Sequence, residues 1–199
     1  MMKSSFALVI AAVLSTTAFA ATNVAPLGTA SQNSTGFDGP SYNGSGPASR
    51  AIDGNTNGFY WDGSVTHSGG EVGNWWSVAW NQDYAMESIN VFNRTDCCSE
   101  RINGFAVSVL NNGIEVWNSG EIASFTPTIT SGLHESGMSF SFGGLVVGDQ
   151  VKIAKTNNNW LHLAEVQVMA VPEPESYAML LAGLGLIAGI ARTRKNSSI

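Results

Sequence analysis

The chain has 199 residues, with 15 acidic and nine basic side chains and a formal net charge of −6. Binding to the phosphates of nucleic acid requires clustered lysine and arginine, so this charge argues against a nucleic-acid partner. The length suits one domain of ~100–150 residues once the two unusual ends of the chain are set aside.

The first residues predict an export signal. Lys3 precedes an apolar run from Phe6 to Leu14, and Ala18-Phe19-Ala20 is a small-x-small cleavage pattern, as in secretory signal peptides. We assign residues 1–21 to the signal peptide and expect the mature protein to start at Ala21 or Thr22. A buried amphipathic helix is the alternative, but the run has no polar stripe.

Residues 22–170 predict an all-β domain. No long stretch of this segment repeats apolar residues with a helical period, whereas several short runs alternate or are rich in β-branched and aromatic residues. The candidate strands are Trp75–Trp80, Ser88–Asn93, Gly104–Leu110, Ile114–Asn118, Met138–Phe142, Gln150–Thr156 and Leu163–Ala170. The glycine- and asparagine-rich breaks between them favour a β-sandwich or jelly roll.

Residues 171–199 form a three-part tail. Pro172-Glu173-Pro174 precedes an uncharged segment, Ser176–Ala191, which is followed by Arg192, Arg194 and Lys195. A membrane helix over 176–191 would be ~24 Å long, short of a ~30 Å hydrocarbon core, so we expect a transient anchor; a permanent single span is the alternative. The basic end would stay cytoplasmic and leave the domain outside.

The tail resembles the PEP-CTERM sorting signal of Gram-negative bacteria, because the tripeptide, the hydrophobic segment and the basic end follow one another in order. The resemblance implies recognition by an exosortase-type membrane protease. It also implies a destination at the cell envelope, the outer surface or the extracellular matrix.

Six separated motifs resemble the fucolectin branch of the coagulation-factor type C (discoidin) domains. They are Asn23-Val24-Ala25-Pro26, Arg50-Ala51-Ile52-Asp53-Gly54-Asn55, Gly63-Ser64-Val65-Thr66-His67-Ser68, Trp75-Trp76-Ser77-Val78, Asn93–Ile102 and Leu163-Ala164-Glu165-Val166. The resemblance implies an eight-stranded jelly-roll β-sandwich of the galactose-binding type. It further implies a lectin for terminal fucose or a related neutral sugar, carried by fucosylated glycans or exopolysaccharide.

His67, Arg94 and Arg101 are the candidate polar contacts. An uncharged sugar must be held by directed hydrogen bonds and an apolar face, and arginine supplies a planar fork of donors. The resemblance implies that these three residues contact fucose and that Asp96 orients the two arginines. Surface salt bridges of the arginines with Asp96 or Glu100 are the alternative.

Cys97 and Cys98 are the only cysteines, and they are adjacent. In an oxidising compartment they can close a vicinal disulfide, whereas reduced or metal-binding thiols are the alternative. The resemblance implies that the disulfide packs against the apolar edge of the sugar and that Tyr60 and Trp61 lie beside its methyl group, unless either ring belongs to the core.

The resemblance also implies a structural calcium ion. Its ligands would be backbone oxygens of Arg50, Asn55 and Ala164 and side chains of Asp53, Ser64 and Glu165. An EF-hand is rejected because the twelfth loop position is Ser64 and not glutamate, and an Asx turn without metal is the alternative. Fucolectins can carry a second disulfide where this chain has Val65 and Ala164, so we expect an apolar contact there.

A binding module is favoured over an enzyme, because the sequence offers no nucleophile, base and orienting residue in a recognisable pattern. His134 and His162 are isolated and are expected to be polar surface or loop residues. An adhesion module without a fucose site is the alternative function, although the acidic charge disfavours anionic membranes. Single sugar sites are weak, so a homo-oligomer would supply avidity.

Overall fold

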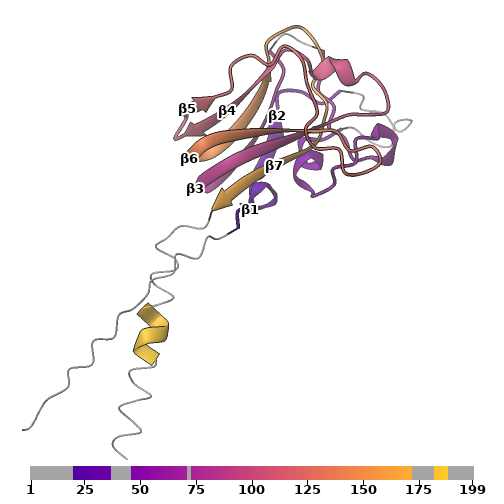
Figure 1. Cartoon of the computed structure of the whole chain (residues 1–199). Coiled ribbons are helices and arrows are strands. Elements are labelled where there is room, and N and C mark those ends of the chain that lie inside the picture. The colour runs from indigo at the N-terminus through magenta and orange to yellow at the C-terminus, as the bar shows by residue number, and fades with distance from the viewer. Residues whose placement is uncertain (1–19, 37–45, 71–72, 172–181, 188–199) are drawn as a thin grey trace, which may run out of the picture.

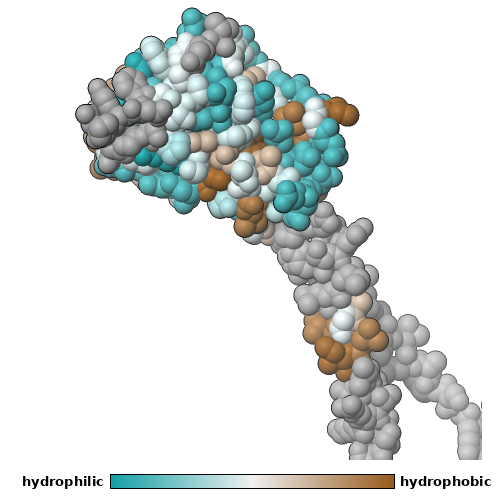
Figure 2. Space-filling model, turned by 180° about the vertical axis from the view of Figure 1, so that it is seen from behind, coloured by the Kyte–Doolittle hydropathy of each residue, from teal (hydrophilic) through white to brown (hydrophobic). Residues whose placement is uncertain are grey.

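The computed structural model of the chain describes residues 20–36, 46–70, 73–171 and 182–187. Most of the predicted signal peptide, residues 1–19, and most of the tail lie outside these ranges. The predicted membrane helix 176–191 is described only over 182–187, which is helical and exposes Leu184, Leu186 and Ile187, brown in Figure 2. Within the described ranges, no helix has the length and hydropathy required to cross a membrane.

The domain is all-β, as predicted, and its strands are antiparallel (Figure 1). The described residues form seven strands: β1 (Thr22–Asn23), β2 (Thr29–Gln32), β3 (Trp75–Asn93), β4 (Phe105–Asn111), β5 (Ile114–Asn118), β6 (Gly137–Lys155) and β7 (Leu163–Val171). Hydrogen bonds connect them in the order β1-β7-β3-β6-β4-β5, and β2 pairs with β3. Four 3-10 helices interrupt the loops: η1 (Ala25–Leu27), η2 (Ala48–Ile52), η3 (Tyr60–Asp62) and η4 (Ser99–Ile102).

The described residues form seven strands where the resemblance implied eight, and two of the seven are long. β3 joins the predicted strands Trp75–Trp80 and Ser88–Asn93, and β6 joins Met138–Phe142 and Gln150–Thr156. Register shifts after Ala79 and after Met86 mark the bend in β3. The first half of β3 pairs with β2 and the second half with β7, so the long strands run through both layers of the sandwich.

The core lies between the two layers. In β4, Phe105, Val107 and Val109 are fully buried and alternate with half-buried residues, as the two-residue period of a strand requires. Trp76 and Trp80 of β3 are also buried, and their indole N–H groups donate to backbone carbonyl oxygens at 2.9 Å. Buried tryptophan therefore has a partner for its polar atom. The outer face in Figure 2 is mostly hydrophilic, with small scattered apolar patches.

The ends of β7 define the two ends of the domain. Leu163, where β7 begins, pairs with Asn93 at the end of β3, whereas Val171, where β7 ends, pairs with Ala85. Eight rises of ~3.4 Å along this nine-residue strand separate the ends by about 27 Å, or roughly 30 Å. The loop carrying η4 follows Asn93 and lies at the end of the domain remote from the tip of β7 (Figure 1).

Candidate functional site

A pocket of about 190 Å³ opens at the η4 end of the sandwich. Its lining residues are Tyr60, Trp61, His67, Arg94, Cys97, Cys98 and Arg101. These are the predicted sugar-site residues except Asp96, which lies behind Arg94. The volume is below the ~300–1,000 Å³ of pockets for drug-sized ligands, so the pocket suits one sugar ring.

Arg94 is held by a two-point ion pair with Asp96. Its Nε and Nη2 donate to Oδ1 and Oδ2 of Asp96 at 2.7 and 2.8 Å, and both side chains are buried. Burial alone would raise the pKa of Asp96, but hydrogen bonds from Arg94 and from the Tyr60 backbone N–H hold that pKa below its usual 3.8. The surface salt bridge considered for Arg94 is therefore a buried, oriented pair that leaves Nη1 for a ligand.

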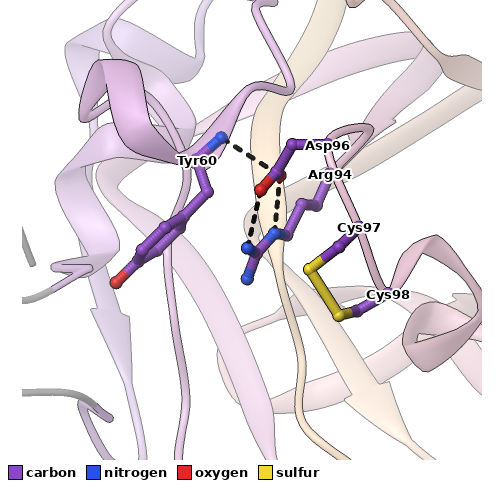
Figure 3. The surroundings of a disulfide bond; sticks show 5 residues. All are labelled: Tyr60, Arg94, Asp96, Cys97 and Cys98. Atoms are coloured by element: carbon purple, nitrogen blue, oxygen red, sulfur yellow. Dashed lines mark hydrogen bonds and ion pairs between the residues drawn. A yellow bond between two sulfur atoms is a disulfide. The ribbon is translucent and has the colours of Figure 1, made fainter.

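Aromatic and sulfur surfaces flank the Arg94 guanidinium. Cζ of Arg94 lies 4.3 Å from the centre of the Tyr60 ring, and the disulfide lies on the other side of the Arg94 side chain (Figure 3). Tyr60 is buried, whereas Trp61 is 49% exposed. Tyr60 thus belongs both to the core and to the pocket wall, and Trp61 lies at the rim.

Cys97 and Cys98 form the predicted vicinal disulfide. Cys98 has φ = 58°, a left-handed conformation that residues other than glycine rarely adopt, and it is the N-cap residue immediately before η4. The ring of the disulfide therefore sets the direction in which η4 carries Arg101 toward the pocket.

His67 lies in a segment that is hydrogen-bonded on both sides. Its N–H donates to the Gly46 carbonyl at 2.9 Å, and the neighbouring Thr66 N–H donates to Leu163 at 2.8 Å. A side chain at Gly46 would collide with the His67 backbone, so this close approach requires glycine. The segment places His67 in the pocket wall, where it is 1% exposed.

The His67 ring is neutral at physiological pH. Burial lowers its pKa, and the charges of Arg94 and Arg101 lower it further, although the hydrogen bond with the Ser68 carbonyl acts in the opposite direction. Nδ1 lies 2.7 Å from that carbonyl, which can only accept, so Nδ1 carries the hydrogen. Nε2 is then the acceptor nitrogen of the ring.

His162 is a pocket-supporting residue that the sequence did not reveal. It was predicted to lie on the surface or in a loop; it does lie in the loop before β7, but it is 1% exposed and its ring centre lies 4.2 Å from that of His67. Burial, with smaller effects of His67 and the nearby cations, lowers its pKa to about 2. The expected surface position was wrong because Leu161 and Leu163, on either side of His162, pair with the His67 segment. His134 lies in a turn beside Phe59, as expected of a loop residue.

The predicted calcium ligands include two acidic residues, the exposed Asp53 and the buried Glu165. Glu165 is fully buried; its Oε1 accepts a hydrogen bond from Gly54 N–H at 3.2 Å, and Oε2 has no hydrogen-bond partner among the described residues. Burial and the charge of Asp53 raise the pKa of Glu165 to about 8. A cation beside these carboxyl groups would favour their charged forms and so offset that shift.

The remaining predicted ligands are less clearly aimed at this pair. The Ser64 hydroxyl donates to the carbonyl of Asn57, and the Asn55 N–H donates to Asp53 Oδ1 at 2.9 Å, as an Asx turn would. Arg50 lies in η2, and Ala164 is fully buried in β7. In the part of the chain that is described, no three His, Cys, Asp or Glu side chains gather as a metal site, so an ion would need backbone and hydroxyl oxygens as well.

Val65 and Ala164 are both fully buried, in one small cluster with Tyr60 and Phe92. The apolar contact expected at this place is therefore present. It lies directly behind the pocket wall that Tyr60 forms.

The sandwich and its end-loop pocket define the class of galactose-binding-like modules, and comparison with known proteins gives the family. The NedA-like, galactose-binding domain model of the F5/8 type C group matches residues 50–153, and the PEP-CTERM protein-sorting motif matches residues 170–195. The chain belongs to the F5/8 type C family of galactose-binding domains and carries a PEP-CTERM tail. That tail implies an exported protein that an exosortase sorts at the cell surface.

Relatives of the chain include several lectins. Fucolectin-6 of Anguilla japonica is 35% identical over 127 residues, which are 62% of this chain and 63% of that protein, less than two thirds of its length. The structure of the Streptococcus pneumoniae fucose binding module SpX-3 matches with a TM-score of 0.64 and 29% identity over 76% of this chain and 99% of the module. The lectin domain of lectinolysin, solved with Lewis B antigen, matches with a TM-score of 0.63 and 29% identity over 76% of this chain and 98% of that domain. These relatives are lectins and binding modules, not enzymes.

Proposed function

We propose that this domain is a lectin that binds terminal fucose, or a closely related neutral sugar, on a glycan or exopolysaccharide. The observation that carries the proposal is the convergence of His67, Arg94, Arg101 and the Cys97–Cys98 disulfide in one pocket. Related proteins named for fucose binding, and one solved with Lewis B antigen, support the choice of sugar.

The pocket offers complementary groups to a 6-deoxy sugar. The guanidinium groups of Arg94 and Arg101 donate hydrogen bonds to adjacent ring and hydroxyl oxygens, and Nε2 of His67 accepts one from a hydroxyl. The disulfide and the rim indole of Trp61 cover the methyl group and the C–H edge. No group in this set is arranged to break a bond, so the sugar is bound and released unchanged.

A glycan array tests the proposal most directly. We expect the purified chain to bind fucose-terminated glycans and to ignore glycans that end in glucose. Calorimetry with free L-fucose and with L-galactose, which differs only by a hydroxyl on C6, gives a matched pair of ligands. Equal affinity for L-fucose, L-galactose and D-glucose would contradict the proposed pocket chemistry.

The tail and the site lie at opposite ends of the domain, which suits a surface-displayed lectin. Val171 ends β7 about 30 Å from Leu163. Leu163 pairs with Asn93, and Arg94 and the loop that carries η4 follow Asn93 in the chain. We propose that the tail holds the domain transiently in the membrane of a Gram-negative bacterium until the exosortase processes it. The pocket then faces outward, toward matrix or foreign glycans.

The neutral state of His67 predicts an acid-sensitive affinity. Because its pKa lies below the ordinary value of 6.5, the ring stays mostly neutral above that pH, so the midpoint at which fucose binding weakens should lie below pH 6.5. At that midpoint and below, protonation turns the acceptor Nε2 into a donor and adds a third positive charge, so binding weakens. Calorimetry across pH measures this. Asp96 stays ionised throughout, because its pKa lies below 3.8.

The matched control for this pH profile is His67→Gln, which does not titrate. It is expected to bind fucose more weakly than the natural protein but with a flat profile. A midpoint at pH 6.5 or above in the natural protein would contradict the lowered pKa assigned to His67.

The double variant Cys97→Ser, Cys98→Ser cannot form the disulfide. We expect it to bind fucose about 10-fold more weakly than the natural protein. The sugar loses an apolar contact worth ~1–1.5 kcal/mol, and Cys98 loses the covalent ring that maintains its left-handed backbone. Calorimetry of the variant measures the change. Because Cys97 is exposed, a mild reductant on the natural protein should reproduce the loss, and an unchanged affinity in both experiments would remove the disulfide from the site.

We propose in addition that the domain binds one calcium ion at the Asp53–Glu165 pair. The supports are the unpartnered Oε2 of buried Glu165 and the two acidic groups placed together. Asp53 and Glu165 would supply charge, and Ser64 with the backbone oxygens of Arg50, Asn55 and Ala164 would complete an oxygen shell. The ion would hold the η2 loop against β7.

A further inference from the structure

The two arginines of the pocket are held in different ways. Arg94 is held by both carboxylate oxygens of Asp96, whereas Arg101 forms no ion pair with any described residue. Instead, Cζ of Arg101 lies 4.4 Å from the centre of the Trp160 ring. Trp160 precedes β7, is 37% exposed and is not one of the pocket-lining residues. It contacts the guanidinium from outside the pocket.

Trp160 is fixed in this place by a buried asparagine. Asn74 is fully buried, and its Nδ2 donates to the carbonyl oxygens of Gly69 and Asn159 at 2.6 and 3.0 Å. These bonds join the loop before β3 to the loop before β7. A Cβ atom added to Gly70 would lie 3.1 Å from Cε2 of Trp160, so the indole is packed directly against the Gly70 backbone. The indole is therefore confined between Gly70 and Arg101.

The backbone of Arg101 is held separately. Lys155 is buried at the end of β6, and its Nζ donates to the carbonyl oxygens of Arg101 and Ile102 at 2.7 and 2.9 Å and also to that of Asn103. All three donors of the ammonium group are thus used at the end of η4. Fixing the backbone leaves the long side chain of Arg101 free to rotate unless another group restrains it.

We infer that Trp160 is a positioning residue that holds the Arg101 guanidinium in the sugar pocket. The inference rests on the proposed sugar site and adds to it a residue that does not line the pocket. A cation on an indole face is attracted to it and loses part of its rotational freedom, so the fork is aligned before the ligand arrives. Without the indole, Arg101 would have to be ordered by the sugar itself.

The test compares Trp160→Ala, Trp160→Phe and a matched control, Trp75→Ala. Trp75 also lies under a cation, with Lys152 Nζ 5.3 Å from its ring centre, but does not line the pocket. We expect Trp160→Ala to weaken binding of free L-fucose about 5- to 30-fold. Trp160→Phe should restore most of the affinity, and Trp75→Ala should bind like the natural protein. Melting temperatures identify any variant that has lost its fold.

A second background separates positioning from general loosening. In Arg101→Lys the planar fork is absent, so adding Trp160→Ala should weaken fucose binding by much less than it does in the natural protein. A full additional loss in that background would overturn the inference, and so would an unchanged affinity of Trp160→Ala for free fucose. Loss confined to fucosylated oligosaccharides would mean that the indole contacts the next sugar instead. If the natural protein itself fails to bind fucose, the proposed function fails rather than this inference.

Discussion

Arg94→Ala is expected to abolish measurable fucose binding. Arg94 supplies charged hydrogen-bond donors at the centre of the pocket, and each such bond contributes ~1.5–3 kcal/mol when its partner is otherwise desolvated. Loss of two bonds therefore weakens binding by roughly two to four powers of ten, which moves a weak monosaccharide site out of the range of calorimetry. Titration of the variant with L-fucose and the glycan array both measure the effect.

The same substitution is expected to destabilise the domain. The Asp96 side chain is buried, and without Arg94 its carboxylate loses both of its side-chain hydrogen bonds, a change that costs ~3–5 kcal/mol for buried ion pairs. Arg94→Lys is therefore the matched control, because it keeps a cation near Asp96 but loses the planar fork. We expect Arg94→Lys to fold, with a higher melting temperature than Arg94→Ala, and still to bind fucose poorly. Natural affinity in Arg94→Lys would contradict the role given to the fork.

The resemblance to the fucolectins implied most of the site residues, and several of the contacts among them are local in the sequence. Arg94 and Asp96 are two residues apart in one loop, so their pairing depends on few degrees of freedom, and the adjacent cysteines have little choice of partner. The alternation of Phe105, Val107 and Val109 likewise predicted a strand with one buried face. In each case the decisive contact is close in sequence or follows the strand period.

The strand boundaries were harder to predict because polar residues occur inside a strand. Asn81, Gln82 and Asp83 are exposed and separate two apolar runs, which favoured a loop. The chain nevertheless stays extended through them, since they lie at the bend where β3 passes from one layer to the other and face solvent. At such a bend, water hydrates the polar side chains while the backbone continues as a strand.

His162 and Trp160 could not be predicted because their contacts join distant loops. His162 meets His67 only when the 66–68 segment pairs with Leu161 and Leu163, and Trp160 meets Arg101 only when Asn74 joins its two loops. Such contacts leave no spacing signal in the sequence. The one indication in the sequence that residues 159–162 could be buried was that they directly precede the last predicted strand.

Removal of calcium is expected to lower the melting temperature by about 5–15 °C. An ion at ~100- to 1,000-fold above its dissociation constant adds ~2.7–4.1 kcal/mol of stability, and ~2–4 °C accompanies each kcal/mol in a domain of this size. Thermal unfolding with excess calcium and with chelator measures the shift. Magnesium should not replace calcium, because it tolerates irregular oxygen shells poorly. Equal melting temperatures with calcium and chelator would contradict the proposed ion.

Glu165→Gln isolates the charge at the centre of this prediction. Without calcium, the raised pKa of about 8 leaves the Glu165 carboxyl largely protonated at neutral pH, so a neutral amide of the same shape replaces it with little strain. The variant is therefore expected to fold as well as the calcium-free natural protein, or better, and to show no shift when calcium is added. If Glu165→Gln is stabilised by calcium as strongly as the natural protein, the ion binds elsewhere. Fucose affinity measured in both metal states then shows whether the ion only stabilises the loops or also shapes the pocket that they carry.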